Sequence, residues 1–361
     1  MTICMPVAFL SSATIPSHLV ENPDDGPPAI LVLAAPAQRG FPHDHGAWDD
    51  EFLPAPFVSA CCCARRFWTG ISKGLLMADA SFGRRLEAVL HHDGPLCVGV
   101  DPSPAALAEW GLDDSAQGAE EFGSALLNAA PGSVGIVKPQ AAFYERYGSA
   151  GIAVLERFCA RAKESGLLVV LDAKRGDIST TGQAYADAYL GPKAHMDVDA
   201  VTVSPYLGMD SVQPFFDVAA ENGRGVFVLA RTSNPNAALF QCAATGDGGS
   251  VAQDVMAAVG RANAARGTES RIGDFGVVFG ATVNTDGYDL QGIGGPILAP
   301  GVGAQGATPT EVGKRFGSCR DRVVIPVSRA VASAGPDVTA LRERIAGISR
   351  ECREVLSRHA D

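Results

Sequence analysis

The sequence predicts an α/β fold, namely a (β/α)8 TIM barrel with an irregular N-terminal extension. Eight short apolar runs follow residue 95, and most are separated by segments with helical periodicity. Polar residues stand at or just beyond the carboxyl ends of these runs, where such a barrel has its active site. The length of 361 residues fits one barrel of about 250 residues and an appendage. A doubly wound open sheet is the alternative, although it more usually has fewer strands.

Residues 1–76 differ in composition from the rest of the chain. Their central part mixes prolines, glycines and charges without a sustained period, so we expect little stable structure there. His43 and His45 stand near three aspartates, but in this setting a solvated polar loop is a better interpretation than a metal site. We therefore place the barrel at 77–361. Met77 is either the true start of the protein or the point where an appendage ends, and the sequence leaves both open.

The predicted elements follow in order from Met77. Apolar residues between Phe82 and Leu90 recur at helical spacing and predict a first helix. Further helices are predicted over 119–130 and over 153–166, the latter ended by a glycine. The apolar runs predict strands at 96–101, 134–140, 167–174, 200–206, 225–233, 275–282, 296–303 and 323–329.

Composition and charge disfavour several classes of protein. A hydrophobic content of 47% supports a large core, and a net charge of −11 disfavours nonspecific binding to nucleic acid or anionic membranes. Apart from Cys61, Cys62 and Cys63, the nine cysteines are scattered singly, so we expect reduced thiols in a cytoplasmic protein. No apolar run has the length of a membrane span, and the N-terminus lacks a secretory signal pattern.

The segment 167–181, which reads LLVVLDAKRGDISTT, is the centre of the chain. On an extended strand Asp172 and Lys174 leave the same face, so a carboxylate and an ammonium are directed together at the strand's C-terminal end. Asp177 follows where the strand breaks into a loop and adds a second carboxylate. A plain structural ion pair is the alternative interpretation of this cluster.

The other predicted strands also end in polar residues. In a barrel these ends meet at one rim, so we expect a single polar mouth, and the N-terminal ends carry nothing comparable. The mouth residues are Asp101, Lys138, Asp172, Lys174, Ser204, Thr232, Ser233, Thr282, Gln305 and Arg329. Lysines and aspartates from neighbouring strands can alternate in sign, and a lysine fixed in this way can act as a general acid. The alternatives are a solvent-facing Lys138 and an Asp101 that forms an ordinary turn.

A phosphate site is predicted at the loops after the seventh and eighth strands. The glycine-rich turn GVGAQG at 301–306 exposes backbone N–H groups, and Ser328 with Arg329 ends the eighth strand. These two loops form the usual phosphate corner of this barrel. A purely structural turn is the alternative. Because no Walker pattern and no GxGxxG after the first strand occur, nucleoside triphosphates and dinucleotides are disfavoured.

Four motifs together resemble a known family. DAKRGDI at 172–178 followed by Thr181, VKPQ at 137–140, TSNP at 232–235 and PGVGAQG at 300–306 resemble orotidine 5′-phosphate decarboxylase, in its long mycobacterial-type subgroup. The resemblance runs from about residue 77 to the C-terminus. It implies a cofactor-free and metal-free conversion of orotidine 5′-monophosphate (OMP) to UMP and carbon dioxide, the last step of de novo pyrimidine biosynthesis.

The resemblance also implies a role for each site residue. Lys174 would donate the proton to the carbon that loses carbon dioxide, and Asp172 would face the departing carboxylate. Lys138, also part of the charge network, and Asp101 would contact the ribose hydroxyls. The base would be held by Ser233 and Pro300, and the phosphate by Gln305 and Arg329.

A homodimer is a further implication of the resemblance. Asp177 and Thr181 would reach into the partner subunit's site, and Ile178 is placed among the substrate-binding residues. An insertion at about 241–270 departs from the shorter bacterial form, and no contacts are assigned there.

Two other functions stay open on the sequence alone. One is a magnesium-dependent phosphosugar decarboxylase of the same barrel type, such as a 3-keto-gulonate 6-phosphate decarboxylase, which shares a DxKxxD core. The KPQ and TSNP segments favour the metal-free enzyme over it. The other is a catalytically decayed nucleotide-binding barrel, although all the expected ionic residues are present.

Overall fold

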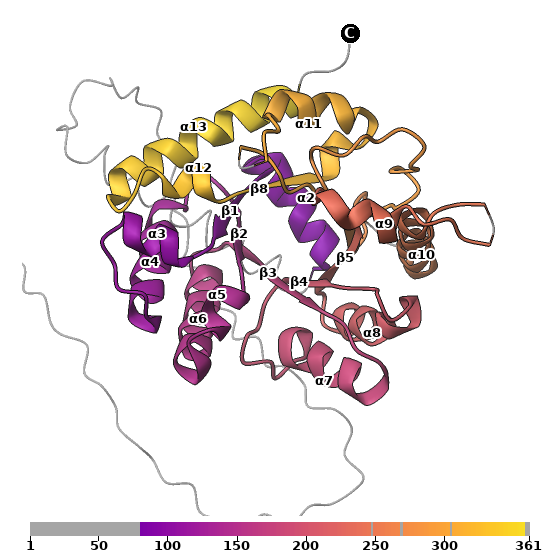
Figure 1. Ribbon diagram of the computed structural model, residues 1–361, viewed down its shortest axis with the longest axis horizontal. Coiled ribbons are helices and arrows are strands. Elements are labelled where there is room, and N and C mark those ends of the chain that lie inside the picture. Colours follow the sequence, from indigo (N-terminus) through magenta and orange to yellow (C-terminus); the bar gives the residue numbers. More distant parts are fainter. Residues whose placement is uncertain (1–79, 247, 268–269, 304, 358–361) are drawn as a thin grey trace, which may run out of the picture. The chain divides into compact units, whose positions relative to one another are not determined.

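The computed structural model describes residues 80–357 except 247, 268, 269 and 304, so the predicted extension 1–76 lies outside the described residues. Within the described part, eight parallel strands pair in sequence order, and β8 returns to β1 to close the barrel (Figure 1). A closed barrel has no sheet edge. The predicted (β/α)8 barrel is therefore confirmed, and the doubly wound open sheet is excluded.

All eight predicted runs form a strand, although most strands end before the predicted limit. The predicted run 296–303 contains only two strand residues, because Gly301 and Gly303 take φ values of +126° and +74° and turn the chain out of the sheet. The strands are β1 (Leu96–Val100), β2 (Ile136–Pro139), β3 (Leu168–Arg175), β4 (Ala200–Val203), β5 (Gly225–Arg231), β6 (Phe275–Phe279), β7 (Ile297–Leu298) and β8 (Val323–Val327).

Helices follow the strands around the outside of the barrel (Figure 1). The α-helices are α2 (Phe82–His92), α3 (Pro104–Glu109), α4 (Ala116–Ala129), α5 (Ala142–Glu145), α6 (Gly148–Glu164), α7 (Ser179–Leu190), α8 (Gln213–Glu221), α9 (Ala238–Gln241), α10 (Val251–Arg266), α11 (Pro309–Arg315), α12 (Arg329–Ala332) and α13 (Val338–Ser357). Three 3₁₀ helices join them, η1 (Met209–Ser211), η2 (Pro235–Ala237) and η3 (Gly317–Arg322).

The segment 241–270 is mostly a regular part of the barrel. It contains α10, the helix that leads from β5 to β6. Ser250 begins this helix with a capping box, in which its hydroxyl accepts the Gln253 N–H and the Gln253 side chain accepts the Ser250 N–H. That the segment is an insertion relative to the shorter bacterial form stays a prediction.

Helix α2 closes the N-terminal end of the barrel and appears inside the ring of strands in Figure 1. Phe82 and Leu86, both fully buried, pack with Ile136, Phe227 and other inward-facing strand residues in one apolar cluster. The fit is tight at Gly225, where an added Cβ would lie 2.2 Å from Phe82 Cδ1. The helix is thus an integral part of the barrel core.

Buried charged residues lie next to α2 at the N-terminal end of the barrel. The expectation that the N-terminal ends of the strands carry no polar residues like those at the C-terminal rim is therefore wrong. Asp199, directly before β4, is 1% exposed and accepts hydrogen bonds from Arg85 of α2 and, at 2.8 Å, from the Val169 N–H. Asp274, directly before β6, accepts the Gly83 N–H of α2 at 2.7 Å. Because this end of a TIM barrel lies opposite the active site, these contacts serve stability.

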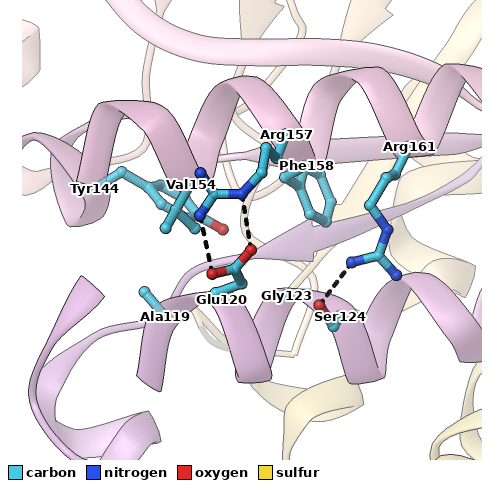
Figure 2. A pocket seen from close by; sticks show the side chains of 9 residues that line it. All are labelled: Ala119, Glu120, Gly123, Ser124, Tyr144, Val154, Arg157, Phe158 and Arg161. Atoms are coloured by element: carbon cyan, nitrogen blue, oxygen red, sulfur yellow. Dashed lines mark hydrogen bonds and ion pairs between the residues drawn. The ribbon is translucent and has the colours of Figure 1, made fainter. Parts of the chain in front are cut away.

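Helices α4 and α6 pack against each other through apolar side chains, and polar pairs join the two helices beside this contact (Figure 2). Arg157 forms two hydrogen bonds with the Glu120 carboxylate, both 2.9 Å, and Arg161 donates to Ser124 Oγ at 2.9 Å. Exposed pairs of this kind contribute little to stability. The close approach depends on Gly123, whose added Cβ would lie 3.2 Å from a ring carbon of the buried Phe158.

Five cysteines lie within the described residues, and reduced thiols stay a prediction for them. All are free, and they are Cys97, Cys159, Cys242, Cys319 and Cys352. Burial raises the pKa of Cys97 and that of Cys159 to about 12, so neither forms a thiolate near neutral pH. Within the described residues no helix is long and apolar enough to cross a membrane.

Candidate active site

Strands β2 and β3 bring three charged side chains together at the C-terminal end of the barrel. Asp172 is 8% exposed, and Lys174 Nζ lies 2.6 Å from its Oδ1. Lys138 contacts the other carboxylate oxygen, with its Nζ 2.9 Å from Asp172 Oδ2. One carboxylate is therefore shared by two ammonium groups, and the charges alternate in sign along the cluster.

The backbone reaches this arrangement by an irregularity that simple strand alternation does not predict. Leu171 pairs with Val201 and Arg175 with Val203, so three residues of β3 lie opposite one residue of β4. Lys174 takes a φ of +49°, in the left-handed region that non-glycine residues rarely adopt. The lysine therefore reaches Asp172 from a bulge and not from a regular extended strand.

Two neutral side chains complete the contacts of the Asp172 carboxylate, and sequence reasoning missed both. The Thr202 hydroxyl donates to Oδ1 at 2.9 Å, and Gln140 Nε2 donates to Oδ2 at 3.2 Å. Each carboxylate oxygen thus accepts two hydrogen bonds. Gln140 belongs to the VKPQ motif, and Thr202 is a polar residue inside the apolar run AVTV, which could have identified it.

The alternating charges determine the ionisation of the cluster. Burial alone would raise the pKa of Asp172, but the ammonium groups of Lys138 and Lys174 outweigh burial and lower this pKa well below its usual value. Burial alone would lower the pKa of Lys138, but Asp172 and then Asp101 outweigh it and raise this pKa above its usual value. At neutral pH Asp172 is ionised and Lys138 is protonated.

A cavity of about 440 Å³ opens above this cluster at the carboxyl ends of the strands. Its size suits a small-molecule ligand. Ten residues that the sequence predicts for the site line it, namely Asp101, Lys138, Asp172, Lys174, Thr232, Ser233, Pro300, Gln305, Ser328 and Arg329. Other lining residues were not predicted, among them Phe143, Leu229 and Asn234.

Asp101 lies at the end of β1 beside the lysine cluster. Its Oδ2 accepts a hydrogen bond from Ser328 Oγ at 2.6 Å. Its Oδ1 is buried and has no hydrogen-bond partner among the described groups. A buried carboxylate oxygen without a partner is costly. Asp101 also lines the cavity.

The far side of the cavity is formed by the loops after β5, β7 and β8. The Ser233 hydroxyl donates to Gln305 Oε1 and so joins the loop after β5 to the loop after β7. Thr232, next to Ser233, is fixed in turn by Gln241, whose Oε1 accepts the Thr232 N–H at 2.8 Å. Arg329 begins α12 directly after β8 and lines the same cavity. A guanidinium beside a glycine-rich turn can bind a phosphate.

Several predicted residues lie outside this cavity. Asp177, Ile178 and Thr181 stand at the start of α7, where Ile178 is 57% exposed and donates its N–H to Asp177 Oδ1 at 2.8 Å. Ser204 and Thr282 do not line the cavity either. The polar mouth therefore contains fewer of the strand-end residues than the sequence predicts. The Ser204 N–H donates to the Arg175 carbonyl at 2.7 Å, which continues the strand pairing beyond the bulge.

The described residues contain no group of three or more His, Cys, Asp or Glu side chains arranged to hold a metal ion. In the cavity, the Asp172 carboxylate contacts the ammonium groups of Lys138 and Lys174. His43 and His45 fall outside the described residues.

Comparisons with known proteins agree on one family. The model of the orotidine 5′-phosphate decarboxylase / HUMPS family matches residues 94–344. An orotidine 5′-phosphate decarboxylase from Salinispora arenicola is 49% identical over 277 residues, which is 77% of this chain and 99% of the relative. The enzyme of the same name from Streptomyces coelicolor is 50% identical over 262 residues, covering 72% of this chain and 93% of the relative.

Solved structures give the same result. A crystal structure from Streptomyces avermitilis assigned to this activity has a TM-score of 0.74 and 46% identity, covering 77% of this chain and 97% of the other. The OMP decarboxylase structure from Leishmania donovani has a TM-score of 0.62 and 30% identity, covering 76% and 99%. The chain belongs to the orotidine 5′-phosphate decarboxylase / HUMPS family.

Proposed function

We infer that this protein is an orotidine 5′-phosphate decarboxylase, which converts OMP to UMP and carbon dioxide. The observation that carries this conclusion is the Lys138–Asp172–Lys174 cluster in a chain that matches decarboxylases of this name at about half of all aligned positions. The cavity above the cluster also contains Arg329, which gives the substrate phosphate a partner.

Lys174 is the proposed acid of the reaction. When the bond between the pyrimidine ring and the carboxylate breaks, its electron pair stays on the ring carbon and carbon dioxide leaves. The Lys174 ammonium stabilises this negative charge as it develops and then transfers a proton to the carbon, which completes UMP. Its position 2.6 Å from Asp172 fixes the ammonium before the substrate arrives, so little reorganisation is needed during the reaction.

Asp172 is proposed to face the carboxylate that leaves. The carboxylate of Asp172 stays ionised because of its lowered pKa, so two negative charges would approach each other in the bound substrate. Loss of carbon dioxide removes this repulsion, and Lys174 then has a carbanion as its partner. Binding energy from parts of the substrate far from the reacting carbon offsets the repulsion.

The remaining substrate contacts follow from the cavity walls. Lys138 and Asp101 are proposed to contact the ribose hydroxyls, since an ammonium donates and a carboxylate accepts. Ser233 and Pro300 are proposed to contact the base. Gln305, with Arg329 as its cationic neighbour, is proposed to bind the phosphate.

A homodimer is part of the proposal. Side chains beside the rim expose apolar groups after β3, β4 and β5, and clusters of this kind mark interaction sites. They are Ile178 (57% exposed), Tyr206 (79%), Leu207 (53%), Leu239 (74%) and Phe240 (59%). The rings of Tyr206 and Phe240 are 6.3 Å apart, so loops after two strands contribute to one surface. In such a dimer Asp177, Ile178 and Thr181 would reach the partner's site.

A cytoplasmic location also stays a proposal. Its support is the set of five free cysteines among the described residues, since thiols of this kind persist in a reducing compartment.

The test of the function is release of carbon dioxide from OMP labelled at its carboxylate, measured with and without EDTA. We expect release with UMP as the product and the same rate in both conditions. Loss of activity with EDTA would favour the magnesium-dependent phosphosugar decarboxylase. UMP binding without any release of carbon dioxide would favour the catalytically decayed barrel.

A further inference from the structure

We propose that Thr202 is a positioning residue for the decarboxylation, because its one hydroxyl fixes both the Lys174 backbone and the Asp172 carboxylate. The inference rests on the proposed function. It concerns a residue of β4 that lies under the cavity and has no assigned contact with the substrate.

The geometry places Thr202 opposite the bulge of β3. Leu171 pairs with Val201 and Arg175 with Val203, so Thr202 alone faces the three residues between them. Between Leu171 and Arg175 the backbone of β3 has no register partner in β4. The Thr202 side chain supplies a hydrogen-bond partner there, because its Oγ1 accepts the Lys174 N–H at 3.0 Å.

The same hydroxyl acts on the carboxylate. Thr202 Oγ1, which accepts a hydrogen bond from the Lys174 N–H, also donates a hydrogen bond to Asp172 Oδ1 at 2.9 Å. That oxygen is also the one that Lys174 Nζ contacts at 2.6 Å. A closed loop of three hydrogen bonds therefore connects the backbone of Lys174, the hydroxyl, the carboxylate and the ammonium of Lys174.

Two observations indicate that this closed set of hydrogen bonds determines the positions of the reacting groups. Lys174 has a φ of +49°, a conformation that non-glycine residues rarely adopt and that persists only where the surroundings impose it. Thr202 is 1% exposed, so water cannot replace its hydroxyl. Without the hydroxyl the bulge can relax, and the Lys174 ammonium and the Asp172 carboxylate can turn away from the reacting carbon.

The test compares Thr202→Val, which has the same shape without the hydroxyl, with Thr202→Ser, which keeps the hydroxyl. For Thr202→Val we expect kcat for OMP to fall on the order of 10-fold to 100-fold, because small displacements of reacting groups have effects of this size. The Kd for UMP should change by less than about 3-fold, since binding contacts stay in place. Thr202→Ser should keep kcat within about 3-fold of the unaltered protein.

Val201→Ala is the matched control. Val201 is the buried neighbour in β4 and makes no contact with the carboxylate, so its loss should lower the midpoint of thermal unfolding and leave kcat per UMP-binding site unchanged. If Thr202→Val does not fold, Thr202→Ala takes its place with the same expectation.

Three outcomes overturn the proposal. They are a Thr202→Val protein with kcat within 2-fold of the unaltered protein, a Thr202→Ser protein as slow as Thr202→Val, and equal effects on kcat from Val201→Ala and Thr202→Val. Absence of OMP decarboxylation by the unaltered protein is a different result, since it would refute the proposed function itself.

Discussion

At the level of single residues, Asp172 is the group on which the site depends. It accepts four hydrogen bonds, two from lysines and two from neutral side chains, so its orientation is fixed on every side. A carboxylate held by two ammonium groups stays ionised although it is buried. The result is a fixed negative charge beside a fixed positive one, ready before a substrate binds.

This ionisation predicts a pH dependence with a definite sign. Because the pKa of Asp172 is lowered in the folded protein, its contribution to the free energy of unfolding is complete above the unfolded pKa of about 3.9 and is lost as the pH falls towards the folded value. We expect the difference in this free energy between the unaltered protein and Asp172→Asn to be constant from about pH 5 to about pH 8. Below about pH 4 the difference should shift in favour of Asp172→Asn, because protonation of Asp172 destabilises only the unaltered protein.

Urea denaturation at several pH values measures this difference. Asp217→Asn, on an exposed part of α8, is the control for loss of one negative charge. A difference that moves in favour of the unaltered protein below about pH 4 would contradict the assigned pKa direction.

The sequence predicts the charged residues that line the cavity, but it predicts their surroundings poorly. Asp172 and Lys174 stand two positions apart in one motif, so their association is local and visible in the sequence. Thr202 is 30 positions from Asp172, and its contact depends on a shift in the pairing of β3 with β4. No pattern of apolar and polar residues records such a shift, so the bulge and its hydroxyl partner could only be found in the structure.

At the level of elements, α2 is a required part of the barrel. The sequence predicts this helix from its apolar period, but it does not predict where in the barrel the helix packs. Arg85 and Asp199 are 114 positions apart, and Gly83 and Asp274 are 191 positions apart. Contacts over such separations leave no local pattern. The eight strands, in contrast, are each marked by their own apolar run.

Because α2 closes the barrel core, the loss of one of its buried side chains should lower the free energy of unfolding strongly. Phe82 is fully buried among the inward-facing residues of the barrel, so Phe82→Ala should lower the free energy of unfolding by about 3–5 kcal/mol. Deletion of residues 1–76 leaves α2 complete and serves as the control, for which we expect unchanged stability and kcat. Chemical denaturation of both proteins measures the effect. A loss below about 1 kcal/mol for Phe82→Ala would show that α2 does not close the barrel core.

At the level of the whole molecule, the proposed homodimer would place residues of two chains at each working site. The cavity of one chain contains Lys174 and Asp172, whereas Asp177 and Thr181 lie outside it at the start of α7. The exposed apolar side chains near the rim are the proposed surface for a second copy. A symmetric dimer would then give each site residues from both subunits.

Mixed dimers of two inactive variants test this arrangement. In a dimer of one Lys174→Ala chain and one Asp177→Ala chain, one site carries both changes and the other carries neither. Co-expression of the two chains should therefore restore about one quarter of the activity per site, since about half of the dimers are mixed. Mixing Lys174→Ala with Lys174→Met is the control and should restore nothing. No recovery in the first mixture would place Asp177 in its own subunit's site.

The central claim is that Lys174, fixed by Asp172 in the cavity, protonates the carbon that loses carbon dioxide. The most direct measurement is the rate of carbon dioxide release by Lys174→Ala at saturating OMP, together with its Kd for UMP. We predict that the rate falls by at least about 10³-fold and that the Kd for UMP changes by less than about 10-fold. A rate within about 10-fold of the unaltered protein would contradict the claim.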